Sequence, residues 1–80
     1  MDINKLIDIL REGIVEIQFR SLKSGNIYNR EYTLHESMMP LKFKQSNASD
    51  KILCYDVEFQ KMEDIDVSSI EHYKPLQKLS

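Results

Sequence analysis

The residues that could do chemistry are mainly carboxylates gathered in one stretch of the chain. Residues 50–71 hold seven acidic and two basic side chains, whereas residues 1–49 carry a net charge of +1. The acidic candidates are Asp56, Glu58, Glu63, Asp64 and Asp66. Carboxylates at such spacing could exchange protons or hold a cation, but on the polar face of a hairpin they mostly face water. We interpret them as an acidic surface that repels a phosphate backbone and could contact a basic partner.

The remaining chemical groups do not form a catalytic or metal-binding motif. Cys54 is the only cysteine, so it cannot form an internal disulfide, and in a strand it is expected to behave as a small apolar residue. His35 and His72 are 37 positions apart and lack the spacing of a zinc site. The chain contains neither a Gly-x-Ser-x-Gly elbow nor a glycine-rich phosphate loop. We therefore expect a protein without enzymatic activity, cofactor or metal.

Two further groups of side chains have both a binding and a packing interpretation. Tyr28, Tyr32 and Tyr55 could stack on bases. Tyr28 and Tyr32, however, share a strand face with Leu34, and Tyr55 shares one with Val57 and Phe59, which favours packing in the core. Met38 and Met39 could form an adaptable contact surface, or one of them could fill the core.

The composition is that of one small globular domain. The chain has 80 residues, of which 41% are hydrophobic and 30% charged, and it contains only two glycines and two prolines. The first residues, MDINKLIDIL, lack the basic start and the unbroken apolar run of a signal peptide or membrane span. With the single cysteine, this predicts a cytoplasmic protein that does not insert into a membrane.

The elements that would position these side chains begin with a helix over residues 3–12. It is predicted by apolar residues at helical spacing and a glycine stop: Ile3, Leu6, Ile7, Leu10 and Gly13. Strict alternation then predicts a hairpin of strands 14–22 and 27–34 around Gly25, with Arg30 on the same face as the tyrosines. We expect Gly13 and Gly25 each to adopt a left-handed or strained backbone.

Three shorter strands and a tail follow. We predict strands at 41–44, 52–60 and 62–67, a helical turn near 68–70 and a trailing segment over 71–80. Within 52–60 the alternation suggests that Leu53, Tyr55, Val57 and Phe59 face inward, and that Cys54, Asp56 and Glu58 face outward. Because an open sheet this small would leave unprotected edges, about five antiparallel strands with one helix predict a mainly β fold, closed or nearly closed into a barrel.

The chain also resembles a family of very small phage proteins that have an SH3-like β-barrel fold and no assigned activity. The resemblance covers about residues 6–70 and rests on core and turn positions: Glu12, Gly13, Val15, Phe19, Gly25, Thr33, Leu34, Pro40, Asp56, Val67, Ser69 and Ile70. It implies a single SH3-like barrel encoded by a phage and acting in the host cytoplasm. Family members tend to carry aromatic and basic residues in the closing hairpin, where this chain has Met62, Glu63, Asp64 and Asp66.

Three functions remain open from the sequence. The first is a phage accessory protein that binds a host protein through the acidic hairpin, or through Met38 and Met39, and inhibits or redirects it. The second is an oligomeric sponge that captures an anionic nucleotide where Arg11, Arg20 or Arg30 converge at a subunit interface. The third, binding of single-stranded nucleic acid, is disfavoured by the acidic stretch.

Overall fold

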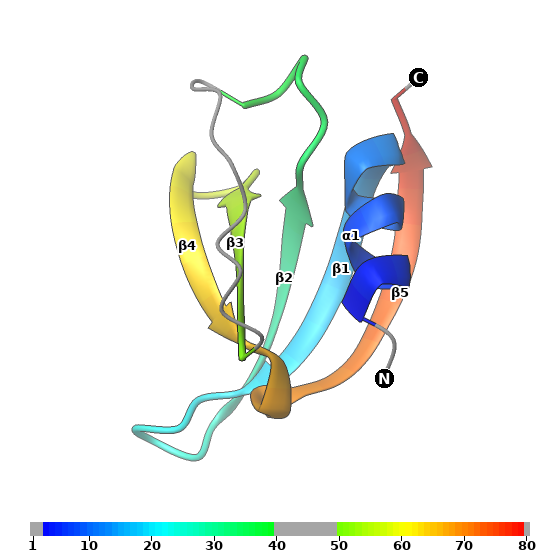
Figure 1. Cartoon of the computed structure of the whole chain (residues 1–80). Coiled ribbons are helices and arrows are strands. Elements are labelled where there is room, and N and C mark those ends of the chain that lie inside the picture. The colour runs from blue at the N-terminus through cyan, green and yellow to red at the C-terminus, as the bar shows by residue number, and fades with distance from the viewer. Residues whose placement is uncertain (1–2, 40–49, 80) are drawn as a thin grey trace.

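The fold is one antiparallel sheet with a helix packed against it (Figure 1). A computed structural model describes residues 3–39 and 50–79. In chain order the elements of these residues are α1 (Ile3–Glu12), β1 (Gly13–Arg20), β2 (Ile27–Thr33), β3 (Lys51–Asp56), β4 (Lys61–Asp66), the 3₁₀ turn η1 (Val67–Ser69) and β5 (Ile70–Lys78). The strands pair in the order β4-β3-β2-β1-β5. The prediction of a mainly β fold with an N-terminal helix is confirmed.

Most of the predicted elements are present, with shifted ends. The helix has the predicted bounds, and β1, β2 and β4 differ from prediction by one or two residues. Strand β3 ends at Asp56 because residues 57–60 turn, with Gln60 at a φ of 56°. The predicted strand 41–44 lies outside the described residues. Closure into an SH3-like barrel stays a prediction, since β4 and β5 are the outer strands of the described sheet.

The prediction of a trailing segment over 71–80 is wrong. Residues 70–78 form β5, which pairs with β1 from Gly13↔Lys78 to Phe19↔Ile70. Pro75 and three charged side chains hide the strand pattern in the sequence, but an outer strand needs only one partner and tolerates proline. Register shifts at Ile14/Val15 and Gln18/Phe19 accommodate the irregular sequence.

The end of α1 is tied to the sheet by hydrogen bonds from neighbouring strands. The backbone carbonyl of Leu10 accepts from the amide of Leu34 at 2.9 Å, and that of Glu12 accepts from the amide of Leu79 at 2.9 Å. The Thr33 hydroxyl donates to the carbonyl of Gly13 at 2.7 Å. These contacts satisfy carbonyls that a helix end leaves without intrahelical partners, and they fix α1 over β1, β2 and β5.

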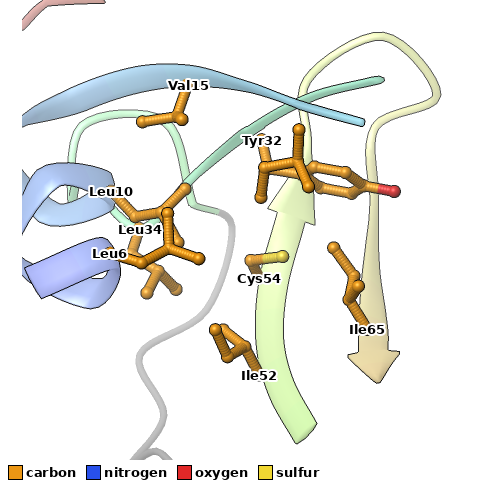
Figure 2. Close-up of a cluster of buried hydrophobic side chains, with 9 residues drawn as sticks. Leu6, Leu10, Val15, Tyr32, Leu34, Ile52, Cys54 and Ile65 are labelled. Atoms are coloured by element: carbon orange, nitrogen blue, oxygen red, sulfur yellow. The ribbon is translucent and has the colours of Figure 1, made fainter. Parts of the chain in front are cut away.

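The core lies between α1 and the inner face of the sheet (Figure 2). Leu6 and Leu10 of the helix are inaccessible to solvent. They belong to a cluster with Val15, Ile17, Tyr32, Leu34, Ile52, Cys54 and Ile65. The predicted apolar face of the helix is therefore confirmed at Leu6 and Leu10, with Ile7 packed against the cluster.

The predicted inward face of β3 is wrong. Ile52 and Cys54 are fully buried in the core, whereas Phe59 is 53% exposed. Both faces of this strand carry apolar residues, so alternation alone cannot tell which face turns inward. The burial of Cys54 confirms that it packs as a small apolar residue, and burial raises the pKa of its thiol, with the carboxylates of Glu63, Asp56 and Asp64 adding to the effect.

Candidate functional site

The best candidate site is a cleft of about 420 Å³ between the end of β1, the loop that follows it, and β4. Its lining brings together groups that are far apart in the sequence. Phe19 supplies accessible aromatic surface, and the almost fully buried Tyr32 and Ile65 also line the cleft. Glu63, Asp64 and Asp66 supply carboxylates, and Arg20, Leu22 and Lys23 come from the end of β1 and the loop after it. We call this feature the β1–β4 cleft. It contains three of the five predicted acidic residues and one of the three predicted arginines.

Tyr32 links the core to this cleft. Its side chain is 1% exposed, and its hydroxyl, which points away from the apolar cluster in Figure 2, donates a 2.8 Å hydrogen bond to Glu63 Oε2. Its ring lies 6.5 Å from that of Phe19, centroid to centroid. Burial, followed by the hydrogen bond and charge of Glu63, raises the pKa of Tyr32. The preference for core packing of Tyr32 over base stacking is confirmed, and Tyr55 is buried as well.

That raised pKa predicts a loss of stability at alkaline pH. An unfolded chain releases the tyrosine proton near the ordinary pKa of 10.0, whereas the folded protein keeps it. The free energy of unfolding should therefore fall as pH rises above about 10, by about 1.4 kcal/mol per pH unit for this group. Urea denaturation between pH 8 and 11 should show a shallower decline for Tyr32→Phe than for the parent. Equal slopes for the two proteins would contradict the assignment.

The acidic residues on β4 do not form one uniform face. Glu63 pairs across the ladder with core residue Cys54, is half-buried, and lies 3.6 Å from Lys61 Nζ. Asp64 and Asp66 pair with Leu53 and Lys51 on the other face of the sheet. Among the described residues neither aspartate takes part in an ion pair. Asp64 is exposed and Asp66 is half-buried like Glu63. Because Glu63 already bonds to Tyr32 and lies beside Lys61, Asp64 and Asp66 are the carboxylates of the cleft that remain for a partner.

Asp56 is not part of this surface, and the prediction that it faces outward is wrong. Its side chain is fully buried. Oδ1 accepts hydrogen bonds from the amides of Glu58 and Phe59, each at 2.9 Å, and Oδ2 lies 3.6 Å from Arg30 Nη1. Asp56 therefore holds the β3–β4 turn together. Of the two acidic residues predicted for this segment, Asp56 and Glu58, only Glu58 is exposed.

The three predicted arginines lie in different environments. Arg30 is cross-strand to the core residue Ile17, and its guanidinium carbon lies 5.2 Å and 4.7 Å from the ring centres of Tyr28 and Phe59. Arg20 is cross-strand to Ile27, so it lies on the face of the β1–β2 ladder opposite to Arg30.

The Nε of Arg20 donates to Glu71 Oε2 at 3.2 Å, and its Nη1 donates to the carbonyl of Gly25 at 2.9 Å. Arg11 is exposed in the last turn of α1 and lines a separate cleft with His35 and Met39. One chain therefore does not bring the three arginines together.

The predicted methionine surface is partly used by the core. Met38 and Met39 are both half-buried, and their amides donate to the carbonyl of His35 in a turn. Met39 packs against the core cluster, which confirms that one of the pair is a packing residue.

The loop beside the cleft presents an apolar residue that the sequence analysis missed. Leu22 is 69% exposed, the largest value among the large apolar residues of the described ranges. The loop is held by hydrogen bonds from the amides of Lys23 and Ser24 to the Ser21 hydroxyl and from the Gly25 amide to the Ser21 carbonyl. The sequence did contain a signal for Leu22, since it is an apolar residue in an otherwise polar turn. Gly25 has a φ of 76°, so its predicted left-handed backbone is confirmed.

Comparisons with known proteins do not assign the site. No protein-family model matches the chain, and neither the curated proteins nor the solved structures contain a significant match. Within residues 3–39 and 50–79, no three His, Cys, Asp or Glu side chains are grouped so that they could hold a metal ion. No helix in the same ranges is long and apolar enough to cross a membrane.

Proposed function

We propose that this chain is a small non-enzymatic module that binds a protein partner through the β1–β4 cleft. The observation that carries the proposal is the union, in one cleft, of accessible carboxylates, aromatic surface and an exposed leucine on a hydrogen-bonded loop. Apolar anchors held in one conformation lose little entropy on binding, and charges around them select the partner.

The charge of the cleft favours a basic partner. Of the two cations that line the cleft, Arg20 is already paired with Glu71. No acidic side chain of the described residues pairs with the other, Lys23. Asp64 and Asp66 of β4 line the same cleft. A lysine or arginine of the partner could pair with these aspartates while its aliphatic stem lies on Phe19. The buried, protonated Cys54 and Tyr32 also support a binding function over nucleophilic or acid–base chemistry.

The expected partner is a host protein. The resemblance to small phage proteins makes host takeover or counter-defence in the host cytoplasm the setting in which such a module would act. The nucleotide-sponge alternative would need arginines from several subunits, because Arg20 and Arg30 lie on opposite faces of one ladder.

A capture experiment with matched charge variants tests the proposed function. The immobilised chain should retain a host protein that the Asp64→Lys/Asp66→Lys variant fails to retain. The control Asp8→Lys/Glu31→Lys makes the same change in net charge at exposed positions of α1 and β2 that do not line the cleft, and it should retain the protein. Glu63 is left unchanged because it accepts the Tyr32 hydrogen bond. Equal retention by both variants would refute the cleft as the contact surface.

A further inference from the structure

The β1–β4 cleft follows the outer edge of β4. Four consecutive residues, Glu63 to Asp66, line it, although successive side chains of a strand point to opposite faces of the sheet. A cleft can touch all four only if it runs along the edge of the strand. Such a run is about 13 Å long, and β4 is an outer strand of the described sheet.

The register of β3 and β4 shows which backbone groups point into that edge. The Val67 amide donates to the Asp50 carbonyl at 2.9 Å, which makes the adjacent pair Lys51↔Asp66 a non-hydrogen-bonded pair of the ladder. Hydrogen-bonded and non-hydrogen-bonded pairs alternate, so Leu53↔Asp64 is also of the second kind. The amides and carbonyls of Asp64 and Asp66 therefore point away from β3, toward the cleft. The Asp66 carbonyl already accepts a 2.6 Å hydrogen bond from the Ser69 hydroxyl, so the two amides and the Asp64 carbonyl are the groups left for an added strand.

The two outer edges of the sheet differ in their protection. Strand β5 carries Lys74, Pro75 and Lys78 and has two register shifts against β1, which are features that discourage further strand pairing. Strand β4 has no proline, and its register with β3 is regular from Lys51↔Asp66 to Asp56↔Lys61. Four of the six residues of β4 are charged as well, so its edge accepts only a strand of complementary charge, but it lacks the proline and the register shifts that protect β5.

Charge decides which strand it accepts. A second copy of this chain, paired edge to edge through β4, would bring Glu63, Asp64 and Asp66 against the same residues of its partner, and like charges on adjacent strands repel. An extended segment that carries lysine or arginine would instead meet carboxylates. On the basis of the proposed function, we infer that the partner adds an extended basic segment as a strand along β4. It would hydrogen-bond to the amides of Asp64 and Asp66 and to the carbonyl of Asp64.

The test uses a defined probe, the acetylated and amidated peptide Thr-Lys-Val-Lys-Val-Lys-Thr. Asp64→Asn removes one carboxylate and keeps the amide, so it should weaken binding about two- to fivefold. Asp64→Pro removes the same charge and also the outward amide, which β3 does not use, and should weaken binding about tenfold further. A probe with glutamate in place of lysine should not bind. Equal affinities for the two variants would overturn the inference.

Amide hydrogen exchange provides a second readout that does not depend on the proline variant folding. Saturation with the lysine probe should slow exchange at Asp64 and Asp66 at least tenfold, with little change at Ile65, whose amide already faces β3. No slowing at these two amides would overturn strand addition, as would failure of the lysine probe to bind. Protection that rises with protein concentration before probe is added would show that a second copy occupies the edge. The capture experiment is independent: cleft-dependent capture without strand addition would leave the proposed function standing and only the binding mode refuted.

Discussion

Replacement of Asp56 by alanine is expected to lower the free energy of unfolding by about 3–5 kcal/mol. The fully buried carboxylate supplies the acceptor for two turn amides and the counter-charge of Arg30. Removing it leaves both amides without that acceptor and leaves Arg30 without its partner, with only 25% of the arginine side chain exposed. Urea denaturation monitored by circular dichroism measures the loss.

Two controls separate the parts of this effect. Asp56→Asn keeps an oxygen for the turn amides and removes the charge, so it should cost less than the alanine variant. Glu58→Ala changes an exposed carboxylate in the same turn and should shift stability by less than about 0.5 kcal/mol. If Asp56→Ala were as stable as Glu58→Ala, the buried cluster would not hold the turn.

Replacement of Gly13 by alanine is expected to destabilise the protein by about 3 kcal/mol. Of the left-handed or strained backbone expected at this position, the left-handed form is wrong, since of the described residues only Gly25 and Gln60 have positive φ. The requirement for glycine comes from β5, because a Cβ at position 13 would overlap the backbone carbonyl of Gln77. The alanine variant must therefore separate β5 from the start of β1.

Gly25→Ala is the matched control for this prediction. A Cβ at position 25 has no heavy atom within 4 Å, so the substitution costs only the left-handed backbone, about 1–2 kcal/mol. Thermal or urea unfolding should rank Gly13→Ala below Gly25→Ala. The reverse order would show that β5 does not pack on Gly13 as described.

The sequence was sufficient where one periodicity dominates a segment. Leu6 and Leu10 recur at helical spacing, and Val15, Ile17 and Phe19 alternate with polar residues, so α1 and β1 are found with nearly correct bounds. It was insufficient where both faces of a strand are apolar, as in β3, or where proline interrupts alternation, as at Pro75 in β5. Tertiary pairing decides these cases, and a local pattern does not contain it.

The site could be predicted only in part for a similar reason. The acidic stretch is visible in the sequence, but which of its carboxylates are paired and which are exposed depends on strand register and on contacts from side chains of β2. Tyr32 reaches Glu63, Arg30 reaches Asp56, and Asp64 remains exposed. The contribution of Leu22 and Phe19 to the same cleft requires the β1–β2 loop to lie opposite β4, which no spacing in the chain indicates.

Site-specific photo-crosslinking tests the central claim, that the partner occupies the β1–β4 cleft, most directly. A benzophenone side chain would be placed at Leu22, on the cleft, or at Leu76, a 43% exposed residue of β5 that lines a different cleft. Irradiation in the presence of the captured host protein should give a crosslink from position 22 that Asp64→Lys/Asp66→Lys suppresses, and little from position 76. A crosslink from position 76 with none from position 22 would contradict the account.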